Sequence, residues 1–304
     1  MAPSPDSMKS ILFALGANFS IAVAKGFAAF YTGSGAMLAE AIHSLADSGN
    51  QGLLLLGMKQ SRRPPNMEYP LGFGKSIYFW SFLVAMVLFS LGGMFSVYEG
   101  WHKLNHPEEL SSPMIAVGVL IFAILAETVS LWGCIREVNK ERYGRNFIQW
   151  FKESRSSELV VVFGEDIAAL LGLALALIAI VMTMVTGNPV YDSIGSVMIG
   201  VLLFIIAYFI AVEVKALLIG QSVEPRILQE MREFLQAQPE VDKVFNLLTM
   251  QMGHDAMVAV KAQMAETGSE RGMLEAINNV ESRFKECFPV TAWLFFEPDY
   301  TDND

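Results

Sequence analysis

The chain of 304 residues has little charge and almost no cysteine. Asp, Glu, Lys and Arg make up only 17% of it, against roughly 25% in an ordinary soluble domain. A single disulfide between the two cysteines, Cys134 and Cys287, could not stabilise the fold of a chain of this length. Neither cysteine lies in a CxxC pair. The formal charge of −10 gives no support for nucleic-acid binding, which needs clustered Lys and Arg. These features exclude a disulfide scaffold and argue against a nucleic-acid partner.

Apolar residues, by contrast, form 53% of the chain and gather in long runs. A helix needs about 20 apolar residues to cross a bilayer. The runs predict an α-helical membrane protein with six transmembrane helices, at 9–31, 36–58, 76–101, 113–138, 157–186 and 190–217. The N-terminal segment has neither a signal-peptide cleavage pattern nor an Arg-rich transit segment, so the first span is expected to stay and a bacterial inner (plasma) membrane is favoured.

Basic residues in the loops predict the orientation, because short loops rich in Lys and Arg remain cytoplasmic. Loops two-to-three and four-to-five, with their borders, hold Lys59, Arg62, Arg63, Lys75, Arg136, Lys140, Arg142, Arg145, Lys152 and Arg155. The loops on the opposite side supply only Lys103. Both termini are therefore expected to face the cytoplasm or its topological equivalent.

The last part of the chain has the pattern of a soluble domain. From Ser222 onward there are 15 acidic and 7 basic residues, a net charge of −8. Periodicity predicts a helix at 224–235, strands at 241–252, 256–264 and 290–297, and a second helix opened by a capping box of Thr267 and Glu270. The order α-β-β-α-β predicts a cytoplasmic, ferredoxin-like α+β domain at 221–304, below a transmembrane transport domain at 1–220.

Ionisable residues at membrane depth cost at least about 2.5–3.5 kcal/mol each, so they are candidates for function. In the second span, AEAIHSLADSGNQ, His43 and Asp47 lie four residues apart, about 40° around a helix, and project from one face. An imidazole beside a carboxylate suits Zn²⁺ or another divalent first-row ion. The alternative is a polar pair that joins two spans through hydrogen bonds.

Other acids in the spans extend this candidate site. Asp166 in the fifth span is a metal ligand in this interpretation, and Glu165 directly precedes it. Adjacent helical residues point about 100° apart, so Glu165 either reaches the same ion, faces a vestibule, carries a proton or pairs with a neighbour. Glu127 and Glu40 are candidates for proton coupling or for a place outside the ligand shell. Lys25 is expected to snorkel or to be paired.

The motifs Ala-Lys-Gly, Thr-Gly-Ser and AEAxHSxxDxxNQ follow one another between residues 18 and 51. With six spans, an acid on the fifth and an α-β-β-α-β tail, the chain resembles the cation diffusion facilitator family of divalent-metal transporters over nearly its whole length. The segment YFWSFLVAMVLFSLGGMFSVYEG and the Glu-Asp pair are similar to the family branch of mitochondrial zinc transporters and their bacterial relatives.

This resemblance implies proton-coupled metal export by alternating access and a homodimer held partly through the tail. The membrane metal site would comprise His43, Asp47 and Asp166. Most members have His four residues before the last acid, where this chain has Val162. Glu165 could substitute by reaching toward the same volume.

Two further metal sites of the family are expected to be absent. Tyr69 and Phe73 stand where loop histidines would stand, and Phe295 takes the place of a histidine in the last strand. Only His254, in a turn, remains in the tail. We therefore expect a tail that binds no metal and serves dimerisation.

The sequence thus predicts a divalent-cation efflux transporter, with zinc favoured, that works as a proton antiporter in the lipid bilayer. It is not expected to be an enzyme or to need a catalytic cofactor, because no HExxH-like helix accompanies the single intramembrane histidine. An exporter of Mn²⁺, Fe²⁺ or Co²⁺ stays open because carboxylates favour harder ions. A non-transporting, metal-linked membrane scaffold also stays open, because the ligand at Val162 is missing. A channel is disfavoured because several carboxylates bind too tightly for fast conduction.

Overall fold

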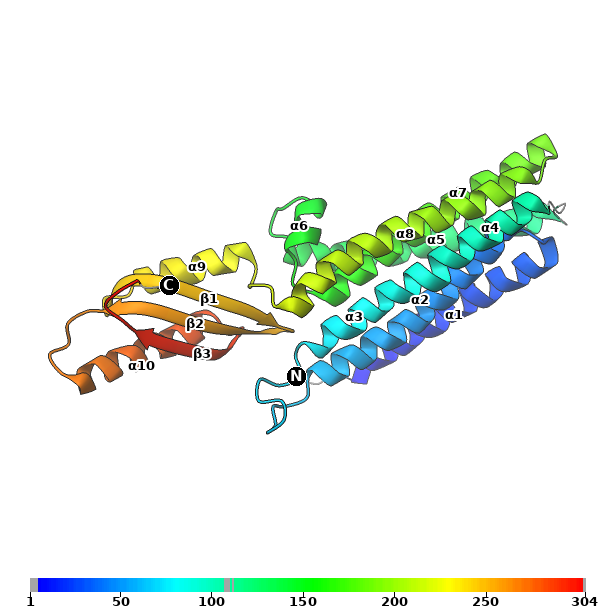
Figure 1. Ribbon diagram of the computed structural model, residues 1–304. Coiled ribbons are helices and arrows are strands. Elements are labelled where there is room, and N and C mark those ends of the chain that lie inside the picture. The colour runs from blue at the N-terminus through cyan, green and yellow to red at the C-terminus, as the bar shows by residue number, and fades with distance from the viewer. Residues whose placement is uncertain (1–4, 107–109, 111, 303–304) are drawn as a thin grey trace.

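The computed structural model describes residues 5–106, 110 and 112–302, with side chains described from residue 19 onward. Long helices lie side by side in a bundle, and a small sheet flanked by two helices extends from one end of it (Figure 1). The helices of the bundle are α1 (Pro5–Thr32), α2 (Gly35–Ser61), α3 (Ser76–Val87), the π-helical segment η1 (Leu88–Met94), α4 (Phe95–Asn105), α5 (Pro113–Glu141), α7 (Ser157–Thr186) and α8 (Val190–Ile219). A short helix, α6 (Phe147–Glu153), lies in the connection between α5 and α7.

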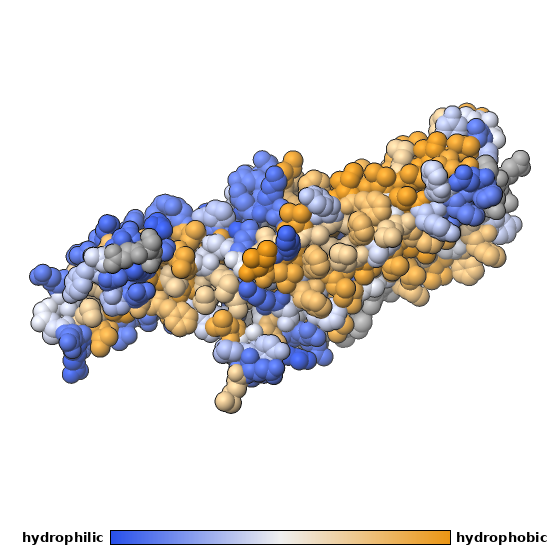
Figure 2. Space-filling view, viewed as in Figure 1, coloured by the Kyte–Doolittle hydropathy of each residue, from blue (hydrophilic) through white to orange (hydrophobic). Residues whose placement is uncertain are grey.

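Four helical segments in the described part of the chain are long and apolar enough to cross a membrane. They are Ser76–Asn105, which runs through α3, η1 and α4, together with α5, α7 and α8. Apolar residues cover the middle of the bundle in Figure 2, and hydrophilic ones gather at its ends and over the sheet. Of the other two predicted spans, the first contributes a shorter apolar helix at Phe19–Thr32, because its side chains before residue 19 are outside the described set. The second, α2, carries too many polar residues to meet the same criterion.

Small residues let α8 approach the helices of the third span closely. A Cβ atom added to Gly200 of α8 would lie 2.7 Å from the backbone nitrogen of Val97 and 2.8 Å from the carbonyl oxygen of Gly93. On the other side, a Cβ at Gly100 would lie 2.7 Å from the carbonyl oxygen of Ser193. Gly93 and Gly200 therefore allow the backbones of the two helical segments to pack closely together.

We predict that Gly200→Ala destabilises the bundle by about 1–3 kcal/mol, because the added methyl group has to push backbone atoms apart. Gly118→Ala on α5 is the matched control, since nothing lies within 4 Å of a Cβ atom there. Thermal unfolding in lipid nanodiscs measures both variants. Equal melting temperatures for the two would contradict this account of the packing.

The first turn of α2 is fixed by a carboxylate from another helix. Asp192 of α8 accepts hydrogen bonds from the Ser34 hydroxyl at 2.5 Å and from the Gly35 backbone N–H at 2.6 Å. An anion at a helix N-terminus satisfies free N–H groups and interacts favourably with the helix dipole. Lys103 of α4 donates to the carbonyl oxygen of Gly33 directly before the helix. These contacts set the position of α2, the helix that carries His43 and Asp47.

The C-terminal part contains α9 (Pro225–Gln236), β1 (Val241–Met252), β2 (Asp255–Met264), α10 (Glu270–Cys287) and β3 (Thr291–Pro298). The predicted order α-β-β-α-β is confirmed. The sheet order is β1-β2-β3, with β1 antiparallel and β3 parallel to β2. The predicted capping box is wrong: the N-cap is Ser269, whose side chain accepts from the Gly272 N–H at 3.1 Å. Gly268, at φ +70°, separates Thr267 from the first turn, so the hydroxyl of Ser269 is the one in reach.

The tip of the β1–β2 hairpin packs against the start of α3. The Tyr78 hydroxyl accepts from the Gly253 N–H at 2.9 Å, and a Cβ at Gly253 would lie 2.6 Å from the carbonyl oxygen of Gly74. Arg155, just before α7, donates to the carbonyl oxygen of Ser222 at 2.6 Å. The loops rich in basic residues therefore lie at the same end of the bundle as the sheet (Figure 1).

Candidate metal site

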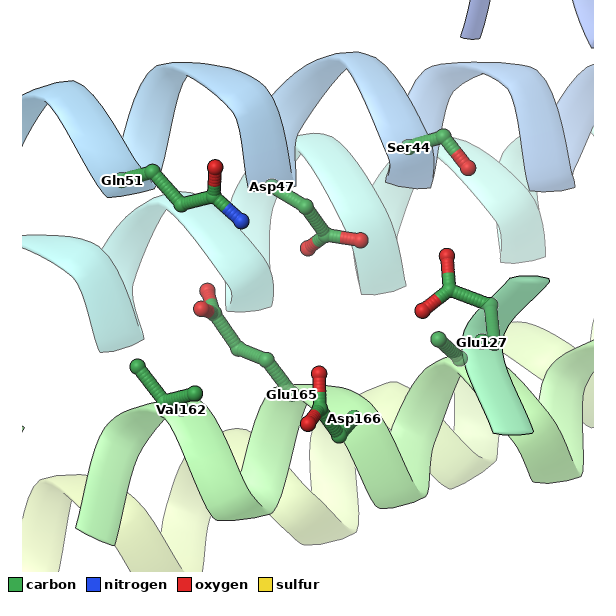
Figure 3. Close-up of a pocket in the computed structure, with 8 residues that line it drawn as sticks. Ser44, Asp47, Gln51, Glu127, Val162, Glu165 and Asp166 are labelled. Carbon is green, nitrogen blue, oxygen red and sulfur yellow. The ribbon is translucent and has the colours of Figure 1, made fainter. Parts of the chain in front are cut away.

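A small cavity inside the bundle is bordered by acids from three helices. Its volume is about 20 Å³, enough for one water molecule or a single ion. The lining residues are Ser44, Asp47, Gln51, Glu127, Val162, Glu165, Asp166 and Ala169. Figure 3 shows the carboxylates of Glu127 from α5 and Glu165 from α7 extending toward Asp47 on α2. The structure thus brings four of the six acidic or histidine candidates to one place.

On α7, both members of the Glu-Asp pair line this cavity together with Val162. Glu165 and Asp166 are 6% and 9% exposed. The side chains of Glu165 and Asp166 point about 100° apart, so both can contact one ion only if it lies between their two directions. Glu165 thus extends into the volume beside Val162, as the interpretation of Glu165 as a substitute ligand requires.

Two polar neighbours that the sequence did not single out hold these carboxylates. Asn50 of α2 donates from its amide nitrogen to Glu165 Oε1 at 2.5 Å. Ser130 of α5 donates to Asp166 Oδ1 at 3.3 Å. Asn50 follows Asp47 by three residues and so lies on the same face of α2, which is the signal that could have identified it. Ser130 gives no such signal, because its partner comes from a different helix.

His43 and Asp47 occupy one face of α2, as predicted, but only Asp47 lines the cavity. His43 Nδ1 lies 3.5 Å from Asp47 Oδ1, and neither ring nitrogen of this buried histidine has a hydrogen-bond partner. Asp47 Oδ1 and Asp166 Oδ2 are also buried without a partner. Because burying such atoms unsatisfied is costly, they are suited to a ligand that supplies the missing interactions.

The acids surround the cavity without converging on one point. Among the described residues, no group of three or more His, Cys, Asp or Glu side chains is close enough to hold a metal ion. A bound ion would have to draw Asp47 of α2 and the Glu165–Asp166 pair of α7 toward each other. His43 lies beside Asp47, and neither of its ring nitrogens makes a hydrogen bond.

Glu40 has a different environment from the other acids. It is fully buried, and its Oε2 atom lies 3.2 Å from Nζ of Lys25 on α1. The same ammonium group donates at 2.6 Å to the hydroxyl of Ser44, a residue that lines the cavity. Of the two alternatives expected for Lys25, the structure shows the paired one. The side chain is buried and does not snorkel. Glu40 is not among the residues that line the cavity.

We expect Lys25→Met to destabilise the protein by about 3–5 kcal/mol, because it leaves the Glu40 carboxylate buried without a counter-charge. The double variant Lys25→Met/Glu40→Gln removes both charges and should recover most of the lost stability. Thermal unfolding of the wild type, both single variants and the double variant in nanodiscs forms a complete cycle. Additive losses in the double variant would show that the two residues do not act as a pair.

The chain is similar to known cation efflux proteins. The family model described as the cation efflux transmembrane domain matches residues 11–219. A mitochondrial proton-coupled zinc antiporter of Xenopus laevis is 37% identical over 225 residues, which is 73% of this chain and 40% of that protein. The human protein of the same description is 35% identical over 231 residues, 75% of this chain and 41% of its own length.

A bacterial protein matches almost from end to end. Zinc transporter ZitB of Escherichia coli is 24% identical over 297 residues, 97% of this chain and 90% of that protein. The chain spans only about two fifths of the length of the mitochondrial relatives that it matches.

Proposed function

Because this chain belongs to the cation diffusion facilitator family of cation efflux proteins, we propose that it exports a divalent metal cation, zinc foremost, in exchange for protons. The observation that carries the proposal is the cavity shared by Asp47, Glu127, Glu165 and Asp166. Carboxylates from separate helices around a space the size of one ion are suited to bind a cation and release it when the helices part. The names of the relatives, as zinc transporters, support zinc as the cargo.

Charge balance explains why protons would be exchanged. Asp47, Glu165 and Asp166 together with neutral His43 carry about −3 when unprotonated, so a bound divalent ion leaves about −1. An empty site with three negative charges is costly in a low dielectric, and protons taken up by these groups would remove that cost. Metal and protons then compete for the same atoms, which is the thermodynamic basis of antiport.

The architecture proposed with this function has six membrane spans. α1 and α2 would join the four strongly apolar segments, with the polar face of α2 turned inward to the cavity. We further propose that the transmembrane domain at 1–220 and the ferredoxin-like domain at 221–304 act as separate units, and that the second holds a homodimer together. Both termini would lie in the cytoplasm. A bacterial plasma membrane stays a prediction, because the relatives include mitochondrial and bacterial proteins.

We predict that Asp47→Ala and Asp166→Ala each reduce zinc flux by more than about tenfold, because even partners outside the ligand shell of a metal cost that much when lost. The measurement is uptake of Zn²⁺ into proteoliposomes under an imposed pH gradient. Glu137→Gln is the control, because that carboxylate is exposed on α5 and pairs with Lys140. A folded wild type that moves no metal would reject the transporter and favour a scaffold, while flux without any response to the gradient would reject antiport.

A second candidate cargo follows from the ligand chemistry. The cavity is lined by four carboxylates while His43 stands outside the lining, and oxygen ligands suit harder ions such as Mn²⁺ and Fe²⁺. Uptake of Zn²⁺, Mn²⁺, Fe²⁺ and Co²⁺, each measured separately in the same proteoliposomes, decides between these cargoes.

Val162→His should shift the selectivity toward zinc by about tenfold, because it adds an imidazole to an oxygen-rich site. Competition between Zn²⁺ and Mn²⁺ for transport measures the ratio. Val162→Leu is the control for side-chain size. An unchanged ratio in the histidine variant would mean that the transported ion does not contact this position.

A further inference from the structure

A second, larger cavity lies where the hairpin tip meets the bundle. Its volume is about 160 Å³, room for several water molecules. Its lining includes Arg155, Ser156 and Glu158 at the start of α7, Glu224 before α9, and Gln251 and His254 at the hairpin. His254 Nε2 lies 3.9 Å from Glu158 Oε1. An imidazole and a carboxylate thus face the same wet space from two different parts of the chain.

The fixed charges around this cavity leave Glu158 available to a cation. Arg155 directs its guanidinium to the backbone, with donor distances of 2.6 Å to the Ser222 carbonyl and 2.7 Å to the Glu153 carbonyl. Arg145 is shared between the carboxylates of Glu153 and Glu224, at 3.1 Å and 3.0 Å. Glu158 is instead paired with His254, which is a metal ligand when neutral.

Glu158 also stands in line with the membrane cavity. Val162, Glu165 and Ala169 follow Glu158 by four, seven and eleven residues, which places all four within a sector of about 60° on one face of α7. Seven residues of helix span about 10 Å, so Glu158 lies two turns below Glu165. One face of α7 therefore connects the larger cavity to the smaller one, and carries a carboxylate at each.

We propose that Glu158 and His254 form a capture site for a divalent cation at the junction of the bundle and the C-terminal domain, from which the ion passes along α7 to the membrane cavity. The proposal rests on the transport function proposed above. The volume suits a cation that keeps part of its water shell, bound by one imidazole nitrogen and one carboxylate. Such a two-ligand site binds weakly, as a site that hands its ion on must. This proposal departs from the expectation that the tail binds no metal, because His254 of the tail would supply one ligand at the junction.

A binding experiment tests this site without relying on transport. In the full-length Asp47→Ala/Asp166→Ala variant in nanodiscs, Zn²⁺ alone is titrated by calorimetry. One weak Zn²⁺ equivalent per chain should remain, and adding His254→Asn or Glu158→Gln should weaken it by about tenfold or more. His106→Asn, a change to an exposed histidine at the opposite end of the bundle, should leave it unchanged. Absence of this equivalent, or its persistence in both junction variants, would overturn the proposal.

Flux measurements then show whether Glu158 and His254 bind the ion or only hold the two parts of the chain together. In the otherwise native protein, Glu158→Gln and His254→Asn should raise KM for Zn²⁺ by about tenfold and leave kcat at saturating metal unchanged. A fall in melting temperature with unaltered KM would mean that the pair only joins the two parts of the chain, and would overturn the proposal. Failure of the wild type to transport would reject the function above, but the calorimetric result would still decide whether this site binds metal.

Discussion

The cost of placing carboxylates away from water governs this structure. Four acids border a cavity of about 20 Å³ inside an apolar bundle, and their repulsion has to be offset by protons, hydrogen bonds or a cation. Asn50 and Ser130 each contribute one donor to this end. Asp47 Oδ1 and Asp166 Oδ2 remain without one. The same deficit would favour a positively charged occupant, as the proposed function requires.

The protein treats its other buried acids in a different way. Glu40 has a permanent counter-charge in Lys25, and Asp192 is held by the hydroxyl and N–H groups at the start of α2. Both carboxylates therefore have partners within the protein, although Glu40 Oε1 is buried without a hydrogen bond. Buried acids thus divide into Glu40 and Asp192, which fix α2 against its neighbours through an ion pair and hydrogen bonds, and the acids that line the cavity. The division follows the partners available, because all of these residues are carboxylates.

Sequence periodicity predicted the parts of this arrangement that lie within one helix. The common face of His43 and Asp47, and the convergence of Glu165 and Asp166 beside Val162, follow from the rise and turn of an α-helix. The strands of the C-terminal domain were also predictable, because their apolar alternation and the hairpin turn are local signals. The position of His43 outside the cavity lining was not predictable, since it depends on how α2 is rotated against α7. The partners of Lys25 and Asp166 were hidden for the same reason: each lies on another helix, and periodicity does not say which helices are neighbours.

The π-helical segment between α3 and α4 has a consequence for how this span meets α8. Positions 88, 92, 96 and 100 are all buried, so the enclosed face advances by four residues at each step. In an uninterrupted α-helix three such steps would drift by about 120° and carry the stripe away from its partner. A π turn holds more residues than an α turn, so the segment takes up part of this drift. The π-helical segment therefore keeps the buried face of this 30-residue span turned toward α8. In a regular α-helix that face would rotate away from α8.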